Sequence, residues 1–176
     1  MAWTTPKTWA TGENVSIGSL NTYLRDNLLA LRNNNNWAVR CSLAGSTALL
    51  SGSTVVNWTV HDFLTGTTAL HSTASGTKLM APEAGYYSLI VNAIFTSGAS
   101  GSRTVGYRFN GAGARYDLNA VTYSPAVSPY GLTGADLVQM TTADYLTIEV
   151  NLTVAATLAG GPTNSRCFWS MVGASS

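Results

Sequence analysis

Apolar residues change their spacing near residue 36, and this change divides the chain into two parts. Before it, residues 16–32 carry apolar side chains at spacings of three and four, which predicts one amphipathic helix. That apolar stripe consists of Ile17, Leu20, Leu24, Leu28 and Leu31. Ser16 is a suitable N-cap, and the run of asparagines at 33–36 favours a helix end there. A helix of this length is marginal alone, so we expect the stripe to pack on the β-body or on copies of itself.

From Trp37 onward, apolar and polar residues alternate, which predicts β-strands. In residues 145–154 every second side chain is apolar, whereas residues 86–95 are apolar on both faces, as expected of a central strand. A strand over residues 103–110 ends at Asn110-Gly111, a dipeptide typical of hairpins. The remaining expected strands are 38–43, 55–60, 77–80, 114–119, 132–140 and 166–172. Short strands at intervals of roughly ten residues indicate a mainly β, antiparallel sandwich.

We therefore expect two parts, an N-terminal attachment arm and helix over residues 1–36 and a β-sandwich domain over residues 37–176. The arm has neither a helical nor a strand period, yet it contains Trp3, Pro6 and Trp9. Disordered segments are usually poor in aromatic residues, and Trp commonly anchors protein interfaces. Our hypothesis is that this arm docks on another protein; the alternative is that Trp3 and Trp9 fold back onto the chain's own helix.

Charge is scarce, and this narrows the range of partners. Charged residues make up 10% of the chain, against about a quarter in an ordinary soluble domain. Low charge leaves room for tight self-association. Nine basic and eight acidic residues form no cluster of either sign, so the basic stripe that a nucleic-acid groove needs is missing. The sequence shows no secretion signal and no apolar run of about 20 residues, so we expect production in a cytoplasm without membrane insertion.

Few residues suit catalysis. His61 and His71 are the only histidines, and the pair His61-Asp62 follows an expected strand end, which favours a loop histidine beside an unrelated carboxylate. The acidic residues are scattered singly, and the chain has no phosphate-binding glycine loop and no nucleophile elbow. We expect no enzymatic activity, no cofactor and no metal site.

Two cysteines and three tyrosines remain as candidates for other roles. Cys41 and Cys167 have no metal-binding spacing, but they lie in the first and last expected strands, which tend to be neighbours in a jelly roll. Two buried thiols are the favoured reading, and a disulfide formed after release from the cell is the alternative. Tyr116, Tyr123 and Tyr130 surround an irregular segment and suit contact with protein or carbohydrate. The alternative, which we favour, is that their rings cover the end of the sandwich or a subunit contact.

Four short motifs occur in order across residues 37–173: APEAGYY at 81–87, FNG at 109–111, ADYLTI at 143–148 and FWSMVG at 168–173. Together they resemble the jelly roll of the tumour-necrosis-factor and complement family. APEAGYY resembles that family's P-x-x-G-x-Y lead into a long strand, and FNG resembles its NG hairpin. ADYLTI resembles its G-D-x-[VL] lead into the penultimate strand, with Ala143 in place of the usual Gly, and FWSMVG resembles its closing strand. The resemblance implies a jelly-roll sandwich and a homotrimer with aromatic strand faces around its three-fold axis.

The N-terminal part of the chain contains TPKTWATGE at 5–13 and LNTYLRDN at 20–27. Over residues 3–28 it resembles the start of many tailed-bacteriophage virion proteins, in which TP-x-TW-x-x-GE leads into LN-x-x-x-RDN. The resemblance implies a virion part with an N-terminal anchor and a trimeric head. Such heads serve some phages as tail fibres or receptor binders and others as capsid decorations or spikes.

Our interpretation is a non-enzymatic, homotrimeric virion structural protein, anchored through residues 1–36 and associated with the tail as a fibre or receptor binder. The expected partners are further copies of itself, other virion proteins of tail or capsid, and a host surface receptor or glycan. A capsid decoration or head spike is the alternative. A carbohydrate-binding or glycan-active module is a distant third, because the paired carboxylates of glycosidases are missing from the sequence pattern.

Overall fold

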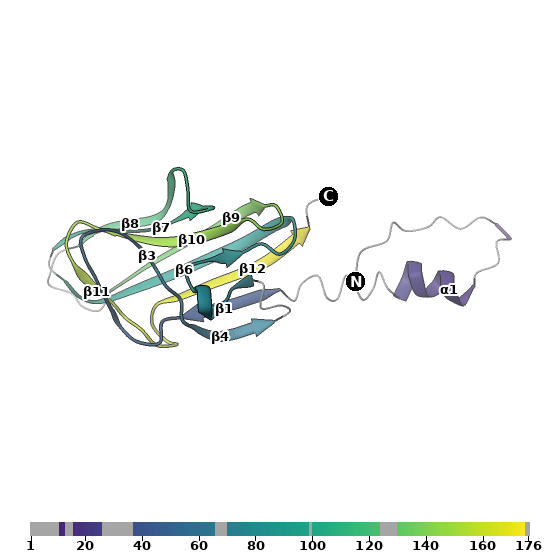
Figure 1. The fold of residues 1–176 in the computed structure, drawn as a ribbon, viewed down its shortest axis with the longest axis horizontal. Helices are drawn as coiled ribbons and strands as arrows, with labels where there is room; N and C mark the ends of the chain where they lie inside the picture. Colours follow the sequence, from purple (N-terminus) through teal and green to yellow (C-terminus); the bar gives the residue numbers. More distant parts are fainter. Residues whose placement is uncertain are drawn as a thin grey trace. The chain divides into compact units, whose positions relative to one another are not determined.

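The computed structural model describes residues 11–12, 16–25, 37–65, 70–98, 100–123 and 130–174 (Figure 1). The chain consists of two compact units, Met1–Asn36 and Trp37–Ser176, each defined by contacts among its own residues. Each unit is described by itself. Within the described residues, no helix is both long and apolar enough to cross a membrane.

The first unit begins its helix where the sequence predicts. α1 spans Ile17–Leu20, and the hydroxyl oxygen of Ser16 accepts a hydrogen bond from the backbone N–H of Ser19 at 3.1 Å. This satisfies an amide that the first helical turn leaves without a partner. Residues Asn21–Arg25 continue as a π-helix, labelled η1, so the expected uniform α-helix is wrong over these residues.

The expected apolar stripe is exposed as far as it is described. Ile17, Leu20 and Leu24 have 79%, 44% and 56% of their surface accessible. Leu28 and Leu31 lie outside the described residues. The predicted packing partner of the stripe therefore stays a prediction.

The second unit contains a seven-stranded antiparallel sheet built around one long strand, β6. Its strand order is β2-β11-β6-β12-β1-β4, and β9 pairs with the remaining edge of β6. The strands are β1 (Ala38–Ser42), β2 (Thr47–Leu49), β4 (Val60–Thr65), β6 (Gly85–Gly98), β9 (Tyr130–Met140), β11 (Ala156–Leu158) and β12 (Arg166–Ala174). One edge of β6 thus pairs with β9, while its other edge pairs first with β12 and then with β11.

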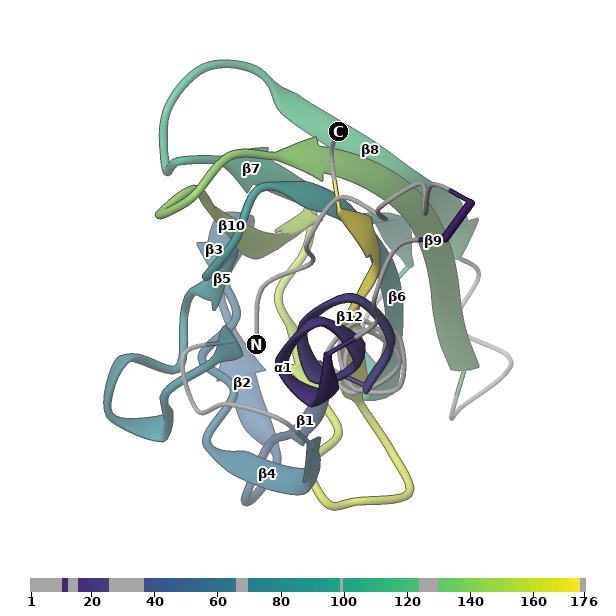
Figure 2. The same cartoon turned by 90° about the vertical axis from the view of Figure 1, so that its right-hand side faces the viewer.

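A five-stranded antiparallel sheet forms the second layer of the unit. Its order is β3-β10-β7-β8, and β5 also pairs with β10. These strands are β3 (Gly52–Val55), β5 (Leu79–Met80), β7 (Gly101–Phe109), β8 (Arg115–Tyr123) and β10 (Tyr145–Leu152), and a short 3₁₀ helix, η3, spans Thr73–Ser75. Figure 2 shows β8 and β9 meeting at one corner, where the Asn119 side-chain amide donates to the Thr133 carbonyl at 2.8 Å. The expected antiparallel jelly-roll sandwich is confirmed.

The hydrophobic core lies between the two sheets. On β6, the inward residues are those that the alternation predicts: Tyr87, Leu89, Val91, Ala93 and Phe95 are all buried. The Tyr87 ring stacks on that of Trp169 with 4.9 Å between centroids. Both rings also have a polar partner, since the Tyr87 hydroxyl donates to the Glu83 carbonyl and the Trp169 indole N–H donates to the Met80 carbonyl. Large aromatic side chains can be buried in this way without an unsatisfied polar group.

The expected hairpin after β7 is confirmed, with a longer loop than its dipeptide suggests. Asn110 and Gly111 both have positive φ, 50° and 65°, and the Ala112 N–H donates to the Phe109 carbonyl at 3.1 Å. Positive φ at both central residues is the geometry of a type I′ turn, which Asn-Gly favours. β8 then begins at Arg115.

The expected strand over residues 55–60 is wrong, because the chain crosses there from one sheet to the other. β3 ends at Val55 and β4 begins at Val60. Between them, the Val56 N–H donates to the Ile148 carbonyl of the second sheet, and the Thr59 N–H donates to the Ser42 carbonyl of the first. Val56 and Trp58 are both buried, so this crossing contributes to the core although it is not a strand.

Candidate interaction surface

A row of side chains crosses the outward face of the seven-stranded sheet. Strand register places these residues opposite one another in the order Phe63, Arg40, Phe168, Ile90 and Ala135, on β4, β1, β12, β6 and β9. Their neighbours along each strand point into the core, so the row faces away from it. Phe63 and Ile90 are 46% and 41% exposed.

Further large apolar side chains on the same strands extend this row into a patch. Tyr86 on β6, Leu137 on β9 and Val172 on β12 are 41%, 59% and 54% exposed. Strand register pairs Leu137 with Ser88, two residues from Ile90 along β6. We call the set Phe63, Tyr86, Ile90, Leu137, Phe168 and Val172 the sheet-face patch. Contiguous exposed apolar patches often mark interaction sites, whereas single exposed apolar residues are common on any protein surface.

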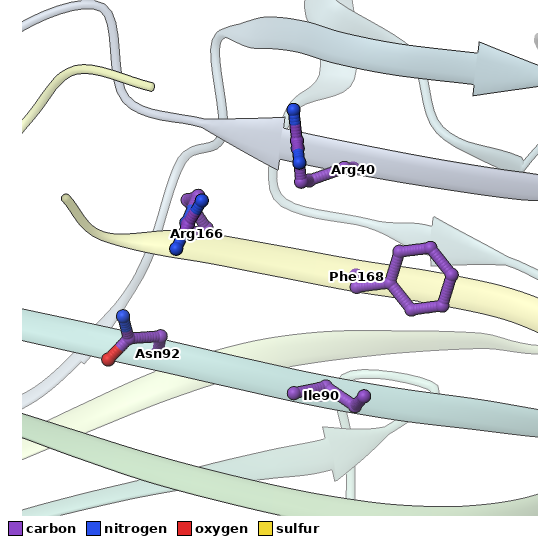
Figure 3. A pocket seen from close by; sticks show the side chains of 5 residues that line it. All are labelled: Arg40, Ile90, Asn92, Arg166 and Phe168. Carbon is purple, nitrogen blue, oxygen red and sulfur yellow. The ribbon is translucent and has the colours of Figure 1, made fainter. Parts of the chain in front are cut away.

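A shallow groove of about 300 Å³ lies within the patch (Figure 3). Ile90 and Phe168 line it together with three polar residues, Arg40, Asn92 and Arg166, which come from the neighbouring strands β1, β6 and β12. Arg40 lies 3.6 Å from the Asp62 carboxylate, which also accepts a 2.7 Å hydrogen bond from the Ser42 hydroxyl. The lining thus combines two apolar side chains with two guanidinium groups, and both apolar residues and Arg are common at protein interfaces.

The three tyrosines expected from the sequence do not behave alike. Tyr116 on β8 is 55% exposed, and its ring stacks on that of Tyr107 with centroids 5.2 Å apart. Tyr130 is half-buried, and its ring stacks on Phe95 and lies under the Arg103 guanidinium, 4.7 Å from its centroid. Tyr130 therefore packs against the core. The side chain of Tyr123 lies outside the described residues, as do Trp3, Pro6 and Trp9.

The two cysteines lie directly opposite each other, as expected of neighbouring terminal strands. Strand register pairs Cys41 of β1 with Cys167 of β12, and both are fully buried free thiols. Burial, followed by the nearby Asp62 charge, raises the pKa of Cys41 to about 12. Burial likewise raises the pKa of Cys167 well above its ordinary value. Without a bound metal ion, both thiols are therefore protonated at neutral pH.

The histidines correct the sequence interpretation. His61 and Asp62 lie inside β4 and not in a loop, and β4 places His61 opposite Cys41. The His61 Nε2 atom is 2.8 Å from the Nδ1 atom of His71, which is fully buried. Burial lowers the pKa of His71, so its imidazole is neutral. The donor atoms of Cys41, His61 and His71 all lie within 4.8 Å of one another. The three residues are 20 and 10 positions apart in sequence, a spacing that gives no signal for a cluster. The pairing of β1 with β4 brings Cys41 and His61 together, and His71 comes from a segment that forms a bridge with Leu79.

Comparison with known proteins supports the fold and nothing finer. No protein-family model and no curated protein sequence matches the chain. The similar solved structures include Eiger, a TNF from S. frugiperda, with 13% identity, coverage of 81% of this chain and 96% of that chain, and a TM-score of 0.57. Murine APRIL has 18% identity, 78% and 99% coverage and a TM-score of 0.56. The globular domain of zebrafish complement 1qA protein has 8% identity, 80% and 99% coverage and a TM-score of 0.59.

Proposed function

We propose that this chain is a non-enzymatic structural protein of a bacteriophage virion, homotrimeric and attached through residues 1–36 as a tail-associated fibre or receptor binder. The virion assignment rests on the resemblance of residues 3–28 to the start of phage virion proteins. The observation that carries self-association is the sheet-face patch, an exposed apolar face on a sandwich whose core is already filled.

Three considerations favour a contact between copies of this chain through the sheet-face patch. Phe63, Phe168 and Ile90 lie in one cross-strand row, so a flat partner surface can cover all three at once. The chain carries little charge to oppose association. The tumour-necrosis-factor and complement family, whose fold the chain shares, packs aromatic strand faces around a three-fold axis, and by analogy we assign this patch the same role.

Self-association is tested by light scattering on the full chain. The expected mass is three times 18.5 kDa. Ile90→Asp places a charge in the centre of the patch and is expected to give a monomer with an unchanged far-ultraviolet spectrum. Leu50→Asp is the matched control, since Leu50 is 79% exposed and lies outside the patch. A wild-type monomer, or an Ile90→Asp trimer, would overturn the proposed interface.

Attachment is tested by removing residues 1–12. We expect the shortened protein to fold and form trimers but not to join virions. Labelled electron microscopy of virions carrying the full chain then gives the location. Label on the tail supports the fibre or receptor-binding assignment, and label on the capsid replaces it with a decoration role. Failure of the full chain to enter particles contradicts the virion assignment, and an unfolded deletion variant contradicts the role of the arm as a docking segment.

A further inference from the structure

Three potential metal ligands from separate parts of the chain meet at the edge of the core. Cys41 comes from β1, His61 from β4, and His71 from a segment that forms an isolated bridge with Leu79. Their sulfur and ring nitrogen atoms lie within 4.8 Å of one another. Cys41 and His71 are fully buried, whereas His61 is half-buried.

The hydrogen bonds of His71 orient its ring toward the other two residues. Its Nε2 atom is 3.3 Å from the Gly76 carbonyl, which can only accept, so Nε2 carries the proton. In a neutral ring this leaves a lone pair on Nδ1, the atom that faces His61. Metal-binding histidines are commonly oriented in this way, by a backbone carbonyl that holds the other ring nitrogen.

The carbonyl that orients His71 is itself held in position. Gly76 follows the 3₁₀ turn Thr73–Ser75, and its carbonyl also accepts from the Trp58 N–H at 2.8 Å. A Cβ atom at Gly76 would lie 2.1 Å from the Trp58 carbonyl oxygen, so no larger residue fits here without movement of the backbone. The loop is thus tied to the buried Trp58, and the position of His71 is determined before any ion binds.

We propose that Cys41 Sγ, His61 Nε2 and His71 Nδ1 form a zinc site. Cys thiolate and His imidazole are both zinc ligands, with bonds of about 2.3 Å to sulfur and about 2.0 Å to nitrogen. Tetrahedral bonds of this length separate two nitrogen ligands by roughly 3.3 Å. The two imidazole nitrogens, now 2.8 Å apart, therefore need only a small separation to admit the ion. The half-exposed side of His61 leaves the fourth position to solvent.

Binding changes protonation and involves no redox step. The Cys41 thiol releases its proton to solvent as the Zn–S bond forms, because a coordinated thiol is deprotonated. Before the ion binds, the His61 Nε2–H group donates a hydrogen bond to His71 Nδ1, which is the acceptor. On binding, this proton moves to His61 Nδ1, so both imidazoles stay neutral and each offers one lone pair to the ion.

The test is cobalt substitution in the purified full chain after treatment with a chelator. We expect one Co²⁺ per chain, a thiolate-to-cobalt charge-transfer band, loss of that band on addition of Zn²⁺, and a higher melting temperature with Zn²⁺. Cys41→Ser is expected to lose the charge-transfer band. Cys167→Ser is the matched control, a second buried cysteine directly opposite Cys41, and should keep the band. His61→Gln should weaken cobalt binding by more than about tenfold.

Three results would overturn the site. A folded wild-type chain that binds neither ion shows that the two histidines form only a buried hydrogen-bonded pair. A charge-transfer band that survives in Cys41→Ser but disappears in Cys167→Ser would show that the thiolate ligand is Cys167 and not Cys41. Should Cys41→Ser fail to fold, the half-exposed His61→Gln decides the question, since unchanged cobalt affinity in that variant contradicts the proposal. None of these readouts depends on trimer formation or on virion attachment.

Discussion

The guanidinium of Arg108 on β7 and the carboxylate of Glu149 on β10 form two hydrogen bonds across the five-stranded sheet. The Nε–Oε1 distance is 2.8 Å and the Nη2–Oε2 distance is 3.1 Å. The Ser53 hydroxyl donates to the same carboxylate at 3.0 Å. These three bonds replace water around Glu149, which is only 5% exposed although it lies on the outward face of its strand. Paired geometry of this kind is stronger than a simple surface ion pair.

This pair predicts a loss of stability in acid. The hydrogen bond from Arg108 lowers the pKa of Glu149, and this effect exceeds the opposing effect of burial. The folded pKa of Glu149 lies below the unfolded value of about 4.3. The stabilisation of the folded chain by the Glu149 carboxylate is therefore complete above that pH, and it disappears as the pH falls through the folded pKa. Glu149→Gln should therefore be less stable than wild type at neutral pH, and the difference should shrink in acid. Urea unfolding from pH 7 to about pH 3 measures this; Glu83→Gln, at an exposed carboxylate, is the control. A constant difference across that range contradicts the prediction.

Truncation of the core at β6 should cost a large share of the stability. Leu89 is fully buried, and strand register places it opposite Trp169. Leu89→Ala is expected to lower the free energy of unfolding by about 2–5 kcal/mol, from lost transfer free energy and the cavity left behind. Leu50→Ala removes the same atoms from a side chain that is 79% exposed. That control should change stability by less than about 0.5 kcal/mol. Equal effects in the two variants would place Leu89 outside the core.

Close contact at the corner between β8 and β9 predicts that Gly134 tolerates no side chain. A Cβ atom at Gly134 would lie 2.4 Å from the Leu118 Cβ atom. Gly134→Ala must therefore push the two strands apart, and overpacking of this kind costs about 1–3 kcal/mol. Gly45→Ala is the matched control, because no atom lies within 4 Å of the corresponding position. Chemical denaturation of both variants gives the comparison, and a Gly134→Ala variant as stable as Gly45→Ala would show that the corner adapts.

Features that depend on neighbours in sequence were predicted well. The alternation on β6 identified the inward residues Tyr87 to Phe95, because each side of a strand faces one environment. The turn at Asn110-Gly111 followed from the backbone preferences of those two residues. Ser16 as an N-cap rests on the same kind of local chemistry. These are properties that a few adjacent residues determine on their own.

Features that depend on strand pairing were missed or misread. Residues 55–60 have the composition of a strand, but their backbone hydrogen bonds go to two different sheets, which no local pattern reveals. His61 looked isolated because its partners are distant in sequence. The pairing of β1 with β4 brings Cys41 opposite His61, and His71 comes from a segment that forms a bridge with Leu79. The sheet-face patch was hidden for the same reason, since each strand contributes only one or two of its residues. The jelly-roll resemblance supplied the fold but not these contacts.

The position of β12 has a consequence for the timing of folding during synthesis. β12 lies between β6 and β1, yet it is the last of these strands to leave the ribosome. Until it emerges, β1 and β4 have no hydrogen-bonded connection to β6, and the half-made sheet exposes two unpaired edges. Such edges readily pair with those of neighbouring chains. Newly made chains on one messenger RNA are therefore most prone to aggregate through these edges just before β12 leaves the ribosome. Slow translation of the codons before Arg166 would lengthen that interval.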